Sequence, residues 1–525
     1  MTRLAPRSVC HGPRPHKTAR RMHAFAPIPL GTPIPDSPHA VSCSLPTMAA
    51  VRGYEEKDPA VVGRLRSGYP RFLVHPFSRR LASALAARHG LAGRTLWLAS
   101  SRRMAGALLA HLQSAGGAGA ALFAGDGVHG VSHPESPELA RSAKLYLQNV
   151  GGFISSREAE DRLAAMGAGP APGGEAYFQG DAAGEIRRIL RPLFAGAADG
   201  DLLLANCGMN AVYSAFRAVT ELQAPRGRTG WVQLGWLYLD TIAILRRFTP
   251  SKSDYLHVPD VMDLGALERL LADRGSGIAG VVAEVPTNPL MQTPDVPALA
   301  SLCRAHAIKL ILDPSLASAF SIDCLPHADL VVNSLTKYTG SDGDIIAGLV
   351  AVNPAAPDAA ALRRAVAAAV EPPYPRDLAR LAAQIGNTRE VLARIEESTP
   401  KVAAFLASHP AVRSIHWALE PASRANYLRV ARSPGATGGA VSFTVRGGLD
   451  RFYDRLRLPK GPSFGMRTTL ICPFIYLAHY DMVTSAAGRA ELAANGLDPE
   501  LLRLCVGTEP AEEIIGALGE ALEGA

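Results

Sequence analysis

The middle of this chain alternates short apolar runs with helical or loop segments in a regular way. Apolar strands that alternate with helices favour a largely parallel, doubly wound sheet. Ligands in such sheets bind at the carboxyl ends of the strands, so polar residues at those ends are the first candidates for a site. The expected strands are 202–205, 230–234, 278–283, 309–312, 330–332 and 345–352.

The strand at 330–332 runs on to Lys337, just beyond its carboxyl end. The chain contains 46 arginines but only 8 lysines, so arginine serves almost wherever a plain positive charge is needed. A lysine on an apolar strand therefore indicates chemistry that a guanidinium cannot perform. Formation of a Schiff base is such chemistry, because it requires a primary amine that can lose its proton. Lys337 thus indicates pyridoxal 5'-phosphate (PLP) as cofactor.

Asp313 ends the strand at 309–312. A carboxylate in that position would keep the pyridine nitrogen of PLP protonated. Alone, Asp313 would be read as a helix cap or turn residue, but it lies 24 residues before Lys337. Ser334 and Thr336 precede the lysine and would donate hydrogen bonds to the phosphate. The alternative for both is a strand-end hydroxyl that is satisfied by the backbone.

The phosphate itself is expected at Cys207-Gly208-Met209, where a strand turns into a helix. Free backbone amides and the helix dipole favour an anion there, and the glycine allows close approach. The segment 100–104 has similar flanks. We prefer 207–210 because it belongs to the regular sheet.

Three further side chains are candidates for the site. Tyr238 would stack on the cofactor ring, and Asn288 would hydrogen-bond its 3'-oxygen. Arg503 lies on an apolar strand and would bind a substrate carboxylate in a bidentate manner. Each has an ordinary alternative, respectively a core aromatic, a turn residue and a structural salt bridge.

Changes of pattern divide the chain into four parts. Residues 1–27 carry six basic residues and no acid, and we interpret them as a disordered basic arm, with a transit peptide or a misassigned start codon as alternatives. Residues 28–172 form an N-terminal extension of mixed α/β pattern. Residues 173–388 are the expected PLP-binding domain, and residues 389–525 a smaller C-terminal α/β domain.

Composition narrows the class of protein. The net charge of +7 comes from scattered arginines without a basic block, so we expect no nucleic-acid partner. No apolar run is long enough to cross a bilayer, so we expect no membrane association. Seven cysteines without CxxC pairs fit a reducing cytosol. We therefore expect a cytoplasmic protein without a metal site.

Together these segments resemble the PLP-dependent enzymes of Cys/Met metabolism, the trans-sulfuration group. Residues 33–71 are similar to the extra region of the long, fungal-type cystathionine γ-synthases. The segments that carry the family resemblance are Cys207–Met209, Tyr238–Thr241, Pro286–Pro289, Asp313, Ser334–Tyr338, Ser463–Gly465 and Arg503–Gly507.

The resemblance implies an α/β fold of the aspartate aminotransferase-like class, fold type I. It implies γ-replacement, in which an O-acyl-L-homoserine and L-cysteine give cystathionine. Lys337 and Tyr238 would be catalytic, and Ser463 with Arg503 would orient the substrate carboxylate. A homodimer or homotetramer is implied. The alternatives are a sibling PLP lyase, an O-acylhomoserine sulfhydrylase and a catalytically silent scaffold.

Two departures from the family pattern bear on the substrate. The family's Tyr-x-Arg, which a neighbouring subunit lends to the site, corresponds to Tyr177-Phe178-Gln179, so Tyr177 is the expected substrate-binding tyrosine. Tyr69-Pro70-Arg71 has the same letters but lies far upstream. The glycines that follow the stacking tyrosine in the family are Leu239 and Asp240 here. These changes leave the reaction and its substrate open.

Overall fold

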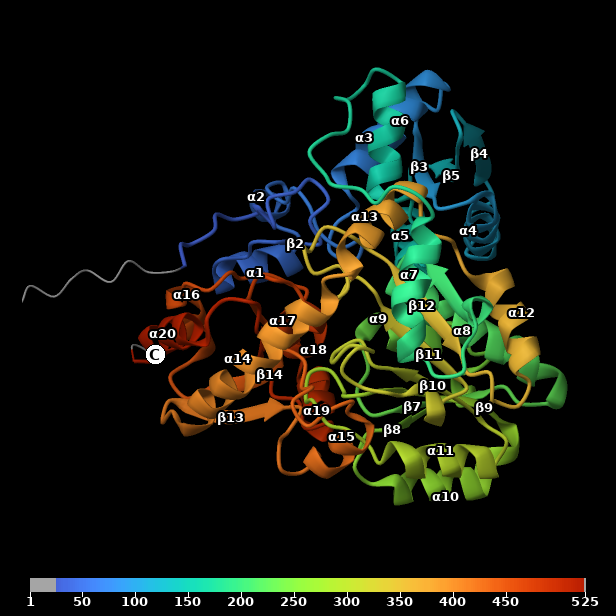
Figure 1. Cartoon of the computed structure of the whole chain (residues 1–525). Coiled ribbons are helices and arrows are strands. Elements are labelled where there is room, and N and C mark those ends of the chain that lie inside the picture. The colour runs from blue at the N-terminus through green and yellow to red at the C-terminus, as the bar shows by residue number, and fades with distance from the viewer. Residues whose placement is uncertain (1–24, 524–525) are drawn as a thin grey trace, which may run out of the picture.

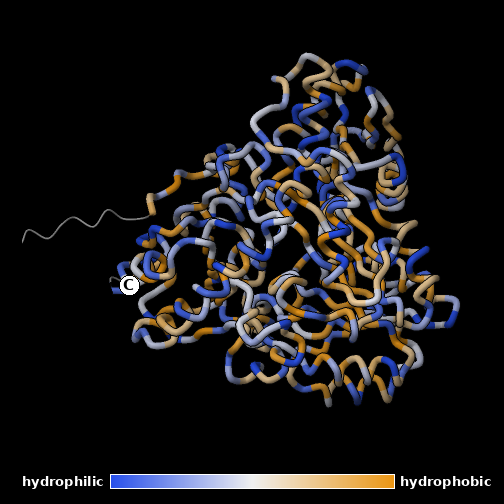
Figure 2. The backbone as a smooth tube through the Cα atoms, in the orientation of Figure 1, coloured by the Kyte–Doolittle hydropathy of each residue, from blue (hydrophilic) through white to orange (hydrophobic). Residues whose placement is uncertain are grey.

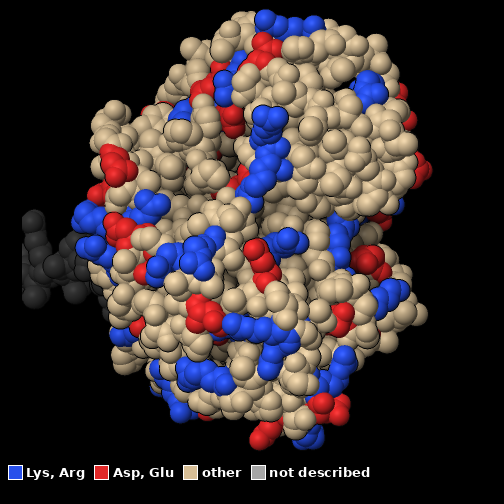
Figure 3. Space-filling view, turned by 90° about the vertical axis from the view of Figure 1, so that its right-hand side faces the viewer, with Lys and Arg blue, Asp and Glu red and all other residues tan. Residues whose placement is uncertain are grey.

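The structure is a computed structural model that describes residues 25–523 (Figure 1). The prediction of a basic arm at residues 1–27 falls almost entirely outside the described residues. Among the residues that are described, no helix is long and apolar enough to cross a membrane. On the face seen in Figure 3, basic and acidic side chains are interspersed, as the scattered arginines of the sequence suggested.

A seven-stranded sheet forms the centre of the described part of the chain. Its strands are β6 (Leu202–Ala205), β7 (Gly230–Leu234), β8 (Tyr255–Val258), β9 (Ile278–Glu284), β10 (Lys309–Asp313), β11 (Leu330–Ser334) and β12 (Gly348–Val352). Their order is β6-β12-β11-β10-β9-β7-β8. β10 is parallel to β9 and β11, whereas β12 is antiparallel to both its neighbours. The expected α/β fold with a largely parallel sheet is confirmed.

Helices cover both faces of this sheet. Alternate residues of β11 face opposite sides: Leu330 and Val332 pack in one hydrophobic cluster, and Val331 packs in another. Figure 2 shows the hydrophobic residues concentrated along the central strands. The first face carries α8 (Gly208–Gln223), α9 (Leu239–Phe248) and α12 (Ala359–Ala369), and the second carries α7 (Ala182–Leu190), α10 (Leu264–Arg274), α11 (Val296–Ala305) and α13 (Pro375–Ile385).

The long helix α14 (Thr388–Ser408) leads into an antiparallel four-stranded sheet of order β13-β14-β16-β15. The sequence pattern favours strands at 412–417, 440–445 and 501–506, and three strands of this sheet agree with it; β15 was missed because it is short and ends in proline. The strands are β13 (Val412–Trp417), β14 (Ala440–Val445), β15 (Leu470–Pro473) and β16 (Leu502–Cys505); the helices are α15 (Arg424–Val430), α16 (Leu449–Arg455), α17 (Phe474–Ala478), α18 (Tyr480–Thr484), α19 (Ala486–Ala494) and α20 (Ala511–Leu522).

The N-terminal region packs against both of these parts. Its first portion contains β1 (Pro33–Ile34), β2 (Ser42–Cys43), α1 (Met48–Glu55) and α2 (Pro59–Val62), and lies beside α16 and α17 (Figure 1). Its second portion has an antiparallel sheet of order β3-β5-β4. The elements of this portion are α3 (Pro76–Arg88), β3 (Arg94–Ala99), α4 (Arg102–Ser114), β4 (Ala121–Gly125), β5 (Val128–Pro134), α5 (Pro137–Val150) and α6 (Ser156–Ala165).

The end of α5 explains one of the departures from the family pattern. Gln148 and Asn149 donate to Oδ1 of Asp240 over 2.7 and 3.0 Å. Asp240 stands at the start of α9, directly after Tyr238 and Leu239. A glycine there could not accept these bonds, so Asp240 ties the N-terminal region to the segment that carries the expected stacking tyrosine. The domain boundaries at 172 and 388 stay predictions.

Candidate active site

A cavity of about 430 Å³ lies at the carboxyl ends of β9, β10 and β11. Every predicted site residue except Tyr177 lines it. The structure thus brings together side chains that are spread over almost 300 positions of the sequence. Those lining the cavity are Cys207, Gly208, Met209, Tyr238, Asn288, Asp313, Ser334, Thr336, Lys337, Ser463 and Arg503.

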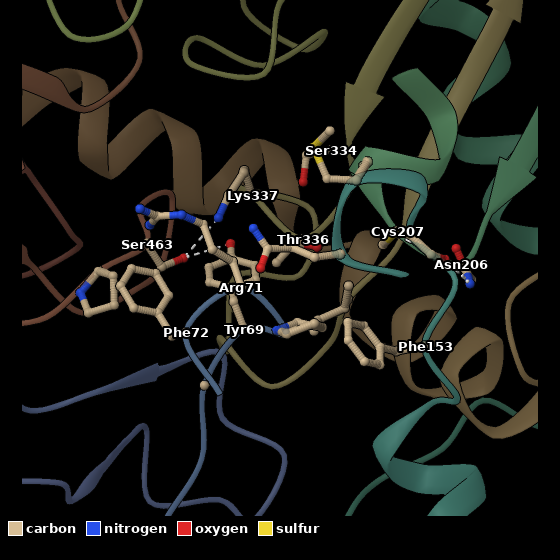
Figure 4. A pocket seen from close by; sticks show the side chains of 18 of the residues that line it. Tyr69, Arg71, Phe72, Phe153, Asn206, Cys207, Ser334, Thr336, Lys337 and Ser463 are labelled. Atoms are coloured by element: carbon tan, nitrogen blue, oxygen red, sulfur yellow. Dashed lines mark hydrogen bonds between the residues drawn. The ribbon is translucent and has the colours of Figure 1, made fainter. Parts of the chain in front are cut away.

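Lys337 follows β11 in a turn that is closed by a bond from its backbone N–H to the carbonyl of Ser334. Its amine donates to Oγ of Ser463 over 3.0 Å (Figure 4). The ring centres of Tyr69 and Phe464 lie 4.0 and 4.6 Å from the same nitrogen. Burial and then the positive charge of Arg503 lower the pKa of Lys337 well below its usual range. The neutral, nucleophilic amine is therefore favoured.

Two carboxyl groups on neighbouring strands line the same cavity as the lysine. Asp313 and Glu284 are direct partners in the register of β10 and β9. Burial raises the pKa of Asp313 to about 6. Burial and then the negative charge of Asp313 raise the pKa of Glu284 well above its usual range. A cationic ligand group would relieve both effects, and a pyridinium nitrogen is such a group.

The turn at Cys207 has the shape of a phosphate cradle. α8 begins at Gly208, and its N-terminal end faces the cavity. A Cβ atom on Gly208 would lie 2.9 Å from Cβ of Ser334, so only glycine lets the two segments approach. Gly151 of the N-terminal region has a φ of 65° and packs on Cys207 from the other side.

The hydroxyls of Ser334 and Thr336, which precede Lys337, differ in their hydrogen bonding. Among the described residues, the Ser334 hydroxyl has no hydrogen-bond partner, and it lies against Gly208, which fits a phosphate ligand. The Thr336 hydroxyl instead accepts from the backbone N–H of Ala347 over 3.1 Å. For Thr336 the backbone-satisfied alternative therefore describes the structure, although the residue does line the cavity.

Arg503 on β16 donates hydrogen bonds to two other predicted site residues. It is only 5% exposed. Its Nη1 donates to Oδ1 of Asn288 over 3.1 Å, and its Nη2 to the carbonyl of Ser463 over 3.3 Å. Its buried Nε has no partner, and no carboxylate pairs with it among the described residues. The salt-bridge alternative is therefore wrong, and the guanidinium suits an anionic ligand.

Tyr238 and Tyr177 have different outcomes. Tyr238 lines the cavity, and its backbone N–H donates to Glu284. Tyr177 does not reach the cavity of its own chain. Its hydroxyl donates to Glu175 and accepts from Nε of Arg376, within a cluster of ion pairs around α13. Since the family pattern places this tyrosine in the site of a neighbouring chain, its role in substrate binding stays a prediction.

Sequence reasoning missed Glu284 and the contribution of the N-terminal region. Tyr69, Arg71 and Phe153 all line the cavity. Figure 4 shows Tyr69 near Ser463 and Lys337, while Cys207 and Asn206 lie at the opposite end of the pocket. The available signal was the sequence Tyr69-Pro70-Arg71, which matches the Tyr-x-Arg pattern of the family. Their distance along the chain from Lys337 concealed their proximity to it.

This donor set fits PLP. The cavity combines an amine whose lowered pKa favours its neutral form, a carboxyl pair that favours a cation, and a helix N-terminus beside the Ser334 hydroxyl. These are the groups that an aldehyde, a pyridine nitrogen and a phosphate require.

Asp313→Asn is expected to stabilise the cofactor-free protein at pH 7 by about 3 kcal/mol, since each pKa unit corresponds to about 1.4 kcal/mol. The folded-state pKa is raised from 3.8 to about 6, so this penalty is absent below pH 4 and grows as the pH rises to 6. Urea unfolding at pH 4 and pH 7 measures it. Asp260→Asn is the control, because Asp260 accepts a similar turn bond while exposed. A variant less stable than the parent at pH 7 would contradict the raised pKa.

Comparison with known proteins agrees with this geometry. Residues 193–523 match the family model described as Cys/Met metabolism PLP-dependent enzyme. An L-2-amino-4-chloropent-4-enoate dechlorinase/desaturase of Streptantibioticus cattleyicolor is 39% identical, over 94% of this chain and 98% of that protein. A cystathionine gamma-synthase of Neurospora crassa is 29% identical, over 95% of this chain and 98% of that protein.

Among solved structures, cystathionine gamma synthase from Xanthomonas oryzae pv. oryzae in complex with cystathionine matches with a TM-score of 0.55. It is 24% identical, and the match covers 70% of this chain and 96% of that chain. At this identity the likeness shows the fold alone, and it confirms the expected α/β fold class.

Proposed function

The chain belongs to the Cys/Met metabolism PLP-dependent enzymes, and from this membership we propose that it expels a leaving group from the γ-carbon of an L-α-amino acid. The observation that carries the proposal is the contact of the Lys337 amine with Ser463, whose carbonyl accepts from Arg503. A base and a carboxylate-binding group thus meet at one end of the cavity, and the phosphate cradle lies at the other.

The residues that would hold PLP follow from the cavity. Lys337 would bind its aldehyde, Asp313 its ring nitrogen, and the turn at Cys207 with Ser334 its phosphate. Tyr238 would cover the ring and Asn288 would hydrogen-bond the 3'-oxygen, since both line the cavity. When bound, PLP supplies an electron-accepting ring that stabilises negative charge at the α-carbon of an amino acid.

Lys337 is the proposed base. Its lowered pKa favours the neutral form of Nζ, so it can accept the α-proton and later return a proton to another carbon of the substrate. Ser463 fixes the amine through the 3.0 Å bond to its Oγ. Arg503 would orient the substrate by binding its carboxylate, and its bond to Asn288 fixes the guanidinium plane.

Two reactions, each with its own substrate, are candidates for this chemistry. The sequence-based proposal is γ-replacement, in which the thiol of L-cysteine displaces the acyl group of an O-acyl-L-homoserine and gives cystathionine. It is supported by the cystathionine gamma-synthase that is 29% identical over nearly the full length. The relative that is 39% identical favours the second, which is loss of chloride from a 4-chloro-2-aminopentenoate. Both expel a group from the same carbon.

A substrate panel decides between them. The purified holoenzyme is incubated with O-acetyl- or O-succinyl-L-homoserine, with and without cysteine or sulfide, and separately with L-2-amino-4-chloropent-4-enoate. Cystathionine supports γ-replacement, and released chloride supports dechlorination. Lys337→Ala protein is the negative control. If the enzyme converts none of these compounds, the proposal is contradicted and the catalytically silent scaffold is favoured.

The remaining parts of the proposal concern the cellular location of the enzyme and its oligomeric state. We propose a cytoplasmic location, on the ground that the described cysteines are all free and mostly buried. We also propose an assembly of two or four copies of the chain, as the family resemblance implies. Size-exclusion chromatography with light scattering tests the assembly.

A further inference from the structure

A short segment of the N-terminal region, residues 68–72, forms one wall of the cavity. It is held in place from both sides. The hydroxyl of Tyr54 donates to the carbonyl of Phe72 over 3.1 Å, and the backbone N–H of Phe72 donates to the carbonyl of Tyr69 over 2.9 Å. Arg71 also donates to the carbonyl of Leu477 in α17. The wall is therefore fixed to the C-terminal domain as well as to α1.

Tyr69 contacts Lys337 both directly, through its ring, and indirectly, through Ser463. Its hydroxyl and the lysine amine each lie 3.0 Å from Oγ of Ser463, and its ring centre lies 4.0 Å from the amine (Figure 4). Ser463 has a φ of 94°, a backbone conformation that non-glycine residues adopt only when their surroundings impose it. Tyr69 bonds to the hydroxyl of this residue and thereby fixes the acceptor of the Lys337 bond.

Arg71 lies on the same wall with its hydrogen-bonding capacity mostly unused. A guanidinium has five N–H donors, and one bond, to the carbonyl of Leu477, is made to the described residues. No described carboxylate forms an ion pair with it. Burial disfavours its charge, but the nearby Tyr238 and Asp240 outweigh this and raise the pKa of Arg71. It stays a cation that faces a ligand cavity.

We propose that residues 68–72 complete the active site within a single chain. Tyr69 is a positioning residue that holds Ser463 against Lys337, and Arg71 binds an anionic group of a bound ligand, which is either the cofactor phosphate or the substrate carboxylate. The segment therefore takes the place that Tyr177 and a neighbouring subunit would otherwise fill. Gln179 supplies no cation there, and Tyr177 is bonded to Glu175 and Arg376. This inference rests on the proposed role of Lys337.

The first test measures cofactor loading, which needs no substrate. Cofactor-free protein is mixed with PLP, and the growth of visible absorption is followed between pH 6 and 9. Tyr69→Phe keeps the ring but loses the hydroxyl, so loading is expected to slow about 3- to 10-fold. Tyr69→Leu also removes the ring and is expected to slow loading further and to shift its pH profile.

Tyr480→Phe is the matched control for this test. It removes a hydroxyl that also joins the N-terminal region to the rest of the chain, through Glu56, but it lies outside the cavity. Its loading rate and pH profile are expected to equal those of the parent. Parental loading by both Tyr69 variants would overturn the positioning role. Because no turnover is read, this outcome is separate from a failure of the proposed reaction.

The second test separates the two anions that Arg71 would bind. Arg71→Gln is titrated with PLP and with pyridoxal, which lacks the phosphate. If Arg71 binds the phosphate, the Kd for PLP rises about 30-fold or more and that for pyridoxal is unchanged. If it binds the carboxylate, both Kd values are unchanged and KM for the amino acid rises by a similar factor. Unchanged values of all three would overturn the role of Arg71.

The third test asks whether the site lies within one chain. Arg71→Gln and Lys337→Ala chains are co-expressed with different tags, and assemblies that contain both are purified. A site built within one chain always contains one of the two defects, so the property lost in Arg71→Gln stays lost. Recovery of that property in the mixed assembly would show that the segment serves a neighbouring chain and would overturn the proposal.

Discussion

Lys337→Ala is expected to abolish the visible absorption of the cofactor-loaded protein and to lower turnover by about 10³-fold or more. The variant loses the only amine that lines the cavity among the described residues. It also loses the base that takes the α-proton in the proposed reaction. Absorption spectra after dialysis against PLP measure the first loss, and the substrate panel measures the second.

Two further lysine variants make this result specific. Lys337→Arg keeps a long basic side chain at the site but cannot form a Schiff base, so it is expected to fail as Lys337→Ala does. Lys401→Arg is the control, because Lys401 is an exposed residue of α14 that pairs with Glu397. Visible absorption in Lys337→Arg equal to that of the parent would show that the cofactor is bound in another way.

Arg503→Lys is expected to lower kcat/KM by about 10²- to 10³-fold. Loss of one partner of a buried, hydrogen-bonded charge pair costs about 2–5 kcal/mol, and lysine cannot reproduce the planar, bidentate guanidinium. The loss is expected mainly in KM, since Arg503 binds the substrate and does not move its protons. Steady-state kinetics on the substrate identified by the panel measure the division between kcat and KM.

A purely structural role for Arg503 would give a different pattern. Its bonds to Asn288 and the carbonyl of Ser463 would then serve only to hold the loop, and the variant would lose cofactor absorption as well as activity. The role in carboxylate binding is contradicted if KM is unchanged. Arg467→Lys is the matched control, because Arg467 lies close to the same loop but pairs with Asp342 outside the cavity.

Much of the site was predictable because its residues follow strands. Asp313 is the last residue of β10 and Lys337 lies shortly after β11, and parallel strands bring their carboxyl ends to one edge of a sheet. Arg503 was predictable for another reason: an arginine in an apolar strand requires an anion. Glu284 was not predicted although it ends β9, because the turn motif that begins at Pro286 closely follows it and accounts for the local sequence pattern.

The contribution of the N-terminal region was not predictable from local pattern. Tyr69 lies in a loop, and its partner Ser463 is almost 400 positions away. No periodicity or spacing connects two such residues; only the packing of the whole chain does. Asp240 carried an indirect signal, because a carboxylate in place of a glycine needs donors, and Gln148 and Asn149 provide them. The prediction for Tyr177 concerns the site of a neighbouring chain, so a single chain does not test it and it stays a prediction.

The most direct measurement is the chemical trapping of the cofactor. Holoenzyme is reduced with borohydride, digested, and mapped by mass spectrometry for the lysine that carries the phosphopyridoxyl group. The structure predicts the group on Lys337 alone among the 8 lysines of the chain. A label on any other lysine, or no label in a protein that binds PLP, would contradict the assignment of this cavity as the active site.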